Sequence, residues 1–348
     1  MTHTDSLPPP SDPQSAVPPH AGEVVLFDAT HGQANWAQTG YPSREMHANF
    51  AGLVHTLCRL GCTCATTYDK PLTKALARAR LLVLPPPTGQ YHARQQCWRS
   101  DPVALFNAEE IQAILGFLRD GGRLLAFAYR FGDSFTRTNL RDLFGPLGCL
   151  LHDDAVIDVT TLRTTPALQT CFETTDDLLP LGWFRPDVGR VCWRSTATFT
   201  LLRGATVQPI ALSPGGQCIA FDRTHRTIRF DSRPIAVAGV LEAGRFVLLG
   251  GPHLFETGPF GLLDQADNAQ FLENILHWLL ADDPSGPEPL RLMLAQPMCW
   301  PGLGLAADGM ELGGVGCPGP RQEAITAVER VLRKTGVLKA LARPGWQP

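Results

Sequence analysis

The residues best suited to chemistry lie directly after a short apolar run near the start of the chain. The run Val24–Phe27 is followed by Asp28 and His31, and then by Gln33 and Trp36. An aspartate three residues before a histidine can orient the imidazole, so the pair could hydrolyse a substrate, bind a metal or cap a loop. We favour capping over ligand binding for this pair, and ligand binding over metal binding or catalysis.

Two later segments have the same character, because each follows an apolar run typical of a strand. Their aromatic side chains could line a sugar site or simply close the core. Arg130 could pair with Asp133, or its planar guanidinium could bind an anionic ligand. The candidate residues are Tyr129, Arg130, Phe131, Asp133 and Ser134 after Leu124–Ala128, and His253 and Glu256 after Arg245–Gly250.

The elements that must position these residues alternate between strand and helix, which predicts an α/β fold with a parallel sheet and helices on both faces. Ligands in such folds bind beyond the carboxyl ends of the strands, so we expect the three polar segments at one edge of the sheet. The predicted strands are Val24–Ala29, Cys64–Tyr68, Leu81–Leu84, Leu124–Ala128 and Arg245–Gly250. The predicted helices are Glu45–Leu60, Leu72–Ala79, one from Asn107 to Asp120, Thr138–Phe144 and Asp267–Leu280. The third begins with a capping pattern, Asn107 followed by Glu110 three residues later, and the last is expected to bury Phe271, Ile275, Leu276 and Leu279. A loop is predicted from Pro85 through Trp98 to Phe106.

The rest of the chain is divided by composition. Residues 1–22 are rich in proline and predict a disordered leader. Residues 23–281 form the predicted α/β domain, with an antiparallel β-rich insertion over about residues 155–240. Residues 282–320 are a Gly- and Pro-rich tail, and residues 321–348 contain a helical pattern that could pack on the domain or dock a partner protein.

Composition narrows the class of protein. The net charge of the 348 residues is −3, which disfavours a nucleic-acid partner, and no apolar stretch is long enough to predict a membrane span. The ten cysteines include no CxxC pair, so we predict mostly small buried hydrophobic residues in a reducing cytoplasm. No glycine-rich phosphate motif joins a strand to a helix, so no nucleotide or other cofactor is predicted.

Three blocks of sequence resemble the GIFT domain, which occurs in gliding-motility ABC-transporter accessory proteins and in an intraflagellar-transport subunit. Bacterial domains of unknown function are similar. The blocks occur in family order within residues 23–281. The first is Val25-Leu26-Phe27-Asp28 with His31-Gly32-Gln33. The second is Gly121-Gly122-Arg123-Leu124-Leu125, then Thr138-Asn139-Leu140, Leu143, Gly148 and Asp154-Ala155-Val156. The third is Val247-Leu248-Leu249-Gly250, His253-Leu254-Phe255, Asn268 and Trp278-Leu279.

The resemblance implies a flavodoxin-like sheet related to class I glutamine amidotransferases, and a module that binds a partner or a small polar ligand such as a sugar. In the amidotransferases a cysteine on a tight strand-to-helix turn is activated by a histidine and a glutamate. Here His253 and Glu256 could match the latter two, but Tyr129-Arg130-Phe131-Gly132 offers neither cysteine nor serine. We therefore expect a non-catalytic binding module. The alternative is a hydrolase or lyase in which Asp28, His31, Asp133 and His253 converge, with or without a metal.

Overall fold

The computed structural model describes most of residues 20–282. Gln33 and Trp36, the predicted leader up to residue 19 and the two predicted C-terminal segments from residue 283 lie outside the described residues. The described ranges are residues 20–31, 50–67, 71–92, 97–158, 171–180, 184–194, 196–222, 227–229, 231–257 and 261–282.

A seven-stranded mixed sheet forms the centre of the molecule, in the order β12-β15-β16-β6-β3-β1-β2. Five neighbouring strands, from β16 to β2, are parallel, whereas β15 runs antiparallel to β16 and to β12. The α/β class is confirmed, and the sheet is mixed on one side. The strands are β1 (Val24–Phe27), β2 (Thr63–Thr66), β3 (Leu81–Leu84), β6 (Arg123–Phe127), β12 (Val207–Leu212), β15 (Pro234–Leu241) and β16 (Gly244–Leu249).

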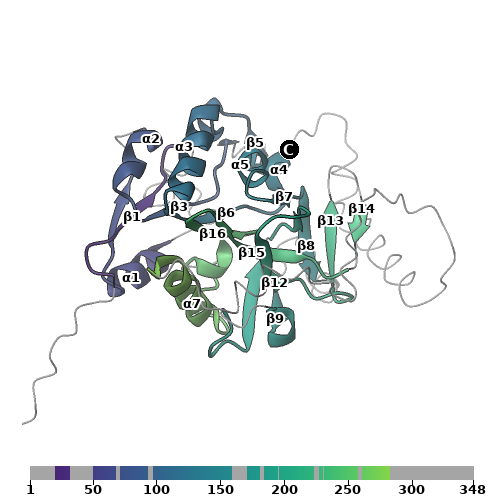
Figure 1. The fold of residues 1–348 in the computed structure, drawn as a ribbon. Helices are drawn as coiled ribbons and strands as arrows, with labels where there is room; N and C mark the ends of the chain where they lie inside the picture. The colour runs from purple at the N-terminus through teal and green to yellow at the C-terminus, as the bar shows by residue number, and fades with distance from the viewer. Residues whose placement is uncertain are drawn as a thin grey trace, which may run out of the picture.

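Helices cover both faces of this sheet (Figure 1). On one face lie α1 (Ala51–Arg59) and α7 (Asn268–Leu280). On the other lie α2 (Leu72–Ala75), α3 (Ala108–Arg119) and α5 (Leu140–Phe144). The strand residues alternate between two buried clusters, because successive side chains of a strand point to opposite faces. Both faces of β3 and β6 are therefore fully buried, as the continuous apolar runs predict.

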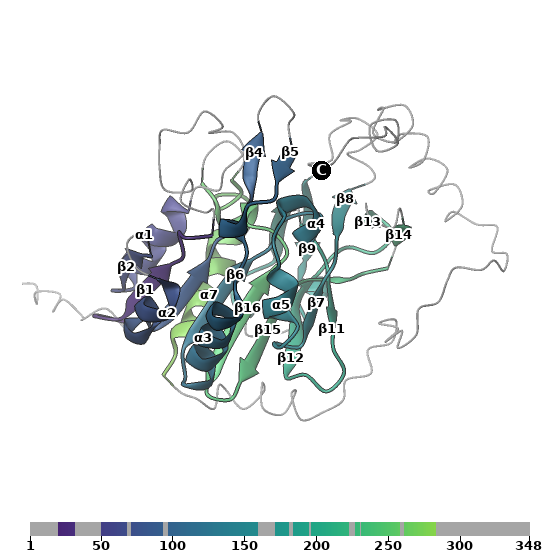
Figure 2. The same ribbon diagram turned by 90° about the horizontal axis from the view of Figure 1, so that it is seen from above.

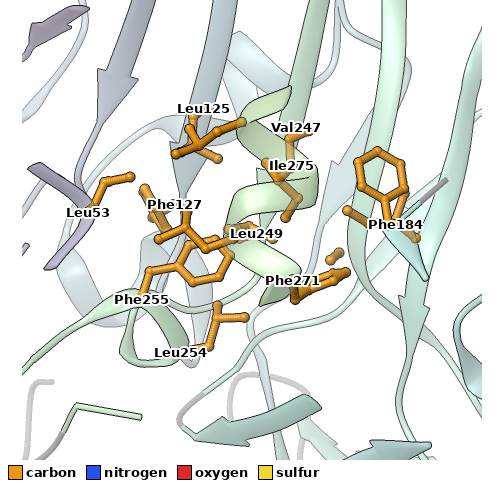
Figure 3. Close-up of a cluster of buried hydrophobic side chains, with 14 of the residues drawn as sticks. Leu53, Leu125, Phe127, Phe184, Val247, Leu249, Leu254, Phe255, Phe271 and Ile275 are labelled. Atoms are coloured by element: carbon orange, nitrogen blue, oxygen red, sulfur yellow. The ribbon is translucent and has the colours of Figure 1, made fainter. Parts of the chain in front are cut away.

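The core beneath α7 is built from alternate residues of the central strands (Figure 3). Leu125 and Phe127 of β6 and Val247 of β16 pack against this helix. The predicted buried face of the helix, which includes Phe271 and Ile275, is confirmed, since both side chains are fully buried. Burying a side chain of this size contributes about 1.5–3 kcal/mol. The core therefore holds the strands rigidly in register beneath their polar ends.

The predicted start of α3 is confirmed in detail. The Asn107 side chain accepts a hydrogen bond from the Glu110 backbone N–H at 3.0 Å. The Glu110 carboxylate in turn accepts from the Asn107 backbone N–H at 2.9 Å, which completes a capping box. Glu110 is thereby fixed in the first turn of the helix.

The β-rich stretch is only partly a separate insertion, because β12 and β15 extend the central sheet itself. The pairing of β12 with β15 is irregular between Pro209 and Ala211. The other strands form small antiparallel sheets, in the pairs β7 (Cys149–Leu151) with β11 (Phe199–Leu201) and β9 (Cys171–Thr175) with β10 (Arg190–Arg194), and in the set β8 (Asp154–Asp158), β13 (Cys218–Asp222) and β14 (Thr227–Arg229).

Local structure differs from the sequence prediction at several other points. The predicted loop before Phe106 contains a hairpin, β4 (Gln90–His92) with β5 (Cys97–Arg99), and a short 3-10 helix, η3 (Pro102–Ala104). The predicted helix from Leu72 becomes a 3-10 helix, η2 (Leu76–Arg78), after one turn, and α4 (Gly132–Thr136) was not predicted. Helix α1 is described from Ala51 onward. Of the described helices, none has the length and apolar character needed to cross a membrane.

Candidate functional site

The carboxyl ends of β1, β3, β6 and β16 meet at one edge of the sheet, because these four strands are parallel (Figure 2). We call the residues directly after each strand its tip. The tips of β1, β6 and β16 carry the polar segments predicted from the sequence, so all three lie on this edge. Each segment makes its own set of contacts.

At the β1 tip, Asp28 and His31 form a buried pair, with 1% and 3% of their surfaces exposed. His31 Nδ1 lies 2.6 Å from Asp28 Oδ2. The other oxygen, Oδ1, accepts hydrogen bonds from the hydroxyls of Thr30 at 2.7 Å and Thr67 at 3.0 Å. The predicted capping role of Asp28 is supported, because Oδ1 also accepts from the Thr30 backbone N–H at 3.1 Å.

The negative charge of Asp28 and the positive charge of His31 stabilise each other. Burial opposes ionisation of Asp28, but the hydrogen bonds from His31 and Thr30 outweigh it and lower the pKa of the carboxyl. Burial likewise opposes protonation of His31, but Asp28 and Glu110 outweigh it and raise the pKa of the imidazole. The pair therefore favours the carboxylate and imidazolium forms.

Two residues of this cluster were not predicted as part of the site. Glu110 Oε2 lies 3.3 Å from His31 Nε2, so the glutamate that caps α3 also contacts the histidine. Phe106 stacks on the imidazole with ring centroids 3.9 Å apart. The capping-box pattern identified Glu110, but nothing in its local sequence shows that it faces a residue 79 positions away.

The β3 tip lies between the β1 and β6 tips. The Thr88 backbone N–H donates to the His31 carbonyl at 3.3 Å, and the Gly89 N–H donates to the Thr136 carbonyl of α4 at 2.9 Å. The backbone after β3 thus joins the two polar segments and fixes their spacing.

At the β6 and β16 tips, Tyr129, His253 and Glu256 form a buried chain. His253 Nδ1 lies 2.6 Å from Glu256 Oε2, and His253 Nε2 lies 3.4 Å from the Tyr129 hydroxyl. Nδ1 thus faces the carboxylate and Nε2 faces the tyrosine hydroxyl. Both ring nitrogens are therefore engaged within the protein.

Arg130 lies beside this chain and stacks on aromatic rings. Its guanidinium carbon lies 5.7 Å from the centroid of the Tyr129 ring and 5.4 Å from that of Phe135. No carboxylate of the described residues pairs with Arg130, and its Nε has no hydrogen-bond partner there. The sequence left two alternatives for Arg130, an ion pair with Asp133 or binding of an anionic ligand. The ion pair with Asp133 does not form in the structure.

The turn after β6 has the backbone of a tight strand-to-helix connection but carries no nucleophile. Phe131 adopts the left-handed conformation, with φ of 61°, and its side chain is buried. Gly132 follows with φ of 48°, and a Cβ there would lie 2.6 Å from the His152 carbonyl oxygen. Neither side chain at this turn can attack a substrate.

Asp133 and Ser134 have structural contacts. The Asp133 carboxylate accepts from the backbone N–H groups of Leu140 and Arg141, at 2.9 and 3.0 Å, and from the Thr138 hydroxyl at 2.7 Å. It therefore fixes the start of α5. The Ser134 hydroxyl donates to the Phe131 carbonyl at 2.9 Å.

The structure does not form the shared cluster required by the hydrolase alternative. His31 pairs with Asp28 and His253 pairs with Glu256, each within its own strand tip. The sheet order places β1 and β16 three positions apart, or about 14 Å at the usual strand spacing. A metal ion needs ligands at about 2 Å. Across the described part of the chain, no group of three or more His, Cys, Asp or Glu side chains is arranged to hold a metal.

Most of the described cysteines are buried, as predicted. The exposure of Cys58 and the lowered pKa of Cys171 were not predicted. Burial raises the pKa of Cys62 to about 11 and those of Cys149 and Cys218 to about 12. Cys58 is exposed on α1. Cys171 is partly exposed on β9, where a hydrogen bond from Cys192, together with Arg194 and His253, outweighs burial and lowers its pKa to about 6.

Comparison with known structures finds similarity at low sequence identity. The IFT52 N-terminal domain aligns with a TM-score of 0.54 and 17% identity, covering 75% of this chain and 99% of that domain. A ThuA-like protein from Bacteroides uniformis aligns with a TM-score of 0.46 and 12% identity over 80% of this chain and 97% of that one. A cytoplasmic protein from Salmonella typhimurium LT2 aligns with a TM-score of 0.45 and 14% identity, covering 74% of this chain and 99% of that protein.

The likeness to the IFT52 N-terminal domain concerns the fold alone. The IFT52 N-terminal domain agrees with the expected resemblance to the intraflagellar-transport subunit at that level. No protein-family model matches the sequence, and no curated protein does.

Proposed function

We propose that this chain is a non-catalytic binding module that recognises a small polar ligand with an anionic group at the tips of β6 and β16. The observation that carries the proposal is Arg130. Its guanidinium stacks on Tyr129 and Phe135 and has no carboxylate partner among the described residues. A charge held in this way, on a rigid aromatic surface, can bind a carboxylate or phosphate with a planar fork of donors.

The neighbouring residues support recognition in preference to turnover. Both nitrogens of His253 are engaged, by Glu256 and Tyr129, so the imidazole orients the tyrosine hydroxyl. The resemblance to amidotransferases implies a nucleophile on a tight strand-to-helix turn, and the tight turn after β6 carries the buried Phe131 instead. The expected hydrolytic route therefore has no attacking group at this turn.

The test is a thermal-shift screen of the full chain with matched neutral and anionic compounds. The panel pairs neutral sugars with sugar phosphates, and adds nucleotides and small carboxylates. A ligand at a hundredfold excess over its Kd stabilises the folded protein by about 2.7 kcal/mol. For a domain of this size that corresponds to a rise in Tm of roughly 5–10 °C.

The variant Arg130→Gln should abolish the shift caused by an anionic compound. The matched control is Arg78→Gln, which removes an exposed arginine from η2, before the amino end of β3 and therefore at the opposite edge of the sheet. The control should retain the full shift. The proposal is wrong if no anionic compound stabilises the protein, or if Arg130→Gln responds like the unaltered chain.

A further inference from the structure

The β9–β10 pair carries two cysteines and an arginine on one face. Arg194 lies directly opposite Cys171, and Cys192 lies opposite Glu173. Opposite residues of an antiparallel pair share a face, as do residues two apart on one strand. The intervening residues Phe172 and Trp193 point into the core. Cys171 and Cys192 are therefore diagonal neighbours on the face turned away from the core.

Direct contacts hold the Cys171 sulfur. The Arg194 Nε–H donates to Cys171 Sγ at 3.1 Å, and Cys192 is the diagonal neighbour of Cys171 across the strand pair. Cys171 is partly exposed, whereas Cys192 is buried. The reachable sulfur is thus the one that accepts a hydrogen bond from the arginine, and the buried sulfur belongs to its diagonal neighbour.

The cysteine pair is tied firmly to the β16 tip. The Asn268 side chain accepts from the Cys192 backbone N–H at 2.8 Å and donates to the Cys192 carbonyl at 2.9 Å. The same amide donates to the Leu254 carbonyl at 3.4 Å, next to His253. His253 contributes positive charge toward Cys171, but its ring nitrogens already bind Glu256 and Tyr129. Chemistry at Cys171 therefore does not require this histidine as a base.

We propose that Cys171 is a modification site for low-molecular-weight disulfides, and that Cys192 resolves the mixed disulfide formed there. The Cys171 thiolate attacks one sulfur of R–S–S–R. A Cys171–S–S–R bond forms, and RS⁻ leaves with the electron pair of the broken bond. Cys192 then loses its proton to solvent and attacks Cys171 Sγ, which releases a second RS⁻. The two cysteines are oxidised by two electrons, and the small disulfide is reduced to two thiols.

The state of the two sulfurs suits these roles. Hydrogen bonding by Cys192, aided by Arg194 and His253, lowers the pKa of Cys171 to about 6. The same hydrogen bond, with burial, raises the pKa of Cys192. At about pH 6.5, Cys171 has a thiolate fraction roughly 250 times that of a thiol with the ordinary pKa of 9.0, and its lower nucleophilicity reduces this advantage by about twentyfold. A rate advantage of about tenfold remains.

The experiment follows the reaction of the full chain with glutathione disulfide at about pH 6.5, with acid quenching and peptide mass spectrometry. Cys58 provides the internal control, because it is more exposed than Cys171. We expect the Cys171 peptide to react about ten times faster than the Cys58 peptide, and the product to mature into a Cys171–Cys192 cross-link. Faster reaction of Cys58 would show that exposure alone governs reactivity and would overturn the proposal.

Two variants separate the roles of the neighbours. Cys192→Ser should stop the reaction at the mixed disulfide on Cys171, whereas an unchanged product would contradict the resolving role. Arg194→Gln should slow modification of Cys171 several-fold, and Arg194→Lys should restore part of the rate because it keeps the positive charge. Equal rates for Arg194→Gln and the unaltered chain would remove the arginine from the proposal.

Discussion

Replacing His31 tests whether the buried pair at the β1 tip stabilises the fold as an ion pair. We consider His31→Gln, which keeps one donor for Asp28 but removes the positive charge. The carboxylate stays buried, with 1% of its surface exposed, and loses the partner at 2.6 Å. Breaking a buried pair by removing one member costs about 3–5 kcal/mol. Because glutamine retains a hydrogen bond, we expect about 3 kcal/mol.

The pH dependence of this loss follows from the two pKa shifts. The raised pKa of His31 means that its charge stabilises the fold fully below the ordinary imidazole value, and that this contribution disappears as pH rises through the folded-state pKa. The lowered pKa of Asp28 keeps the carboxylate ionised across the same window. The difference in stability between the unaltered chain and His31→Gln should therefore be largest near about pH 5.5 and smaller near about pH 9.5.

Urea unfolding followed by circular dichroism at these two values of pH measures the difference. The matched control is His55→Gln, because His55 is exposed on α1. The His55→Gln variant should change the free energy of unfolding by less than about 0.5 kcal/mol at both pH values. If His31→Gln lowers the free energy of unfolding equally at both pH values, or more at the higher pH, the ion-pair reasoning is refuted.

Two further predictions concern positions outside the site. Burial raises the pKa of Asp154 to about 6 from 3.8, so Asp154→Asn should stabilise the fold by up to about 3 kcal/mol near pH 8, and the gain should vanish below about pH 4. Denaturant titration checks this, with the exposed Asp264→Asn as control, and a loss of stability near pH 8 would contradict it. Asn107→Ala should lower the free energy of unfolding by about 1 kcal/mol, because the α3 cap is lost. Asn107→Asp should retain most of the stability, since aspartate also caps helices. Equal losses for the two variants in the same titration would argue against the cap.

Local pattern was sufficient to predict the elements that carry the site. The runs that became β1, β3, β6 and β16 are short and apolar, and polar residues follow three of them, β1, β6 and β16, so their identity and their common edge could be inferred from the sequence. The face of α7 and the capping box of α3 are also encoded within one or two turns of helix. Such signals depend only on neighbouring residues.

Pairings over long sequence separations could not be inferred in the same way. The antiparallel strands β12 and β15 look like parts of an insertion until they are placed beside β16. Glu110 contacts His31 across 79 residues, and Cys171 meets Arg194 across 23. Periodicity contains no information on which strand lies next to which. The sequence therefore did not predict that Cys171, Cys192 and Arg194 lie together on the β9–β10 pair.

The irregular pairing of β12 has a consequence for the behaviour of the protein in solution. β12 is the outermost strand on its side of the central sheet, and an outermost strand can act as a template for β-aggregation with a second molecule. Pro209 has no backbone N–H to offer such a neighbour, and the shift in register between Pro209 and Ala211 distorts the strand. This edge is therefore poorly suited to intermolecular strand addition, and substitution of Pro209 would remove one of the features that protect it.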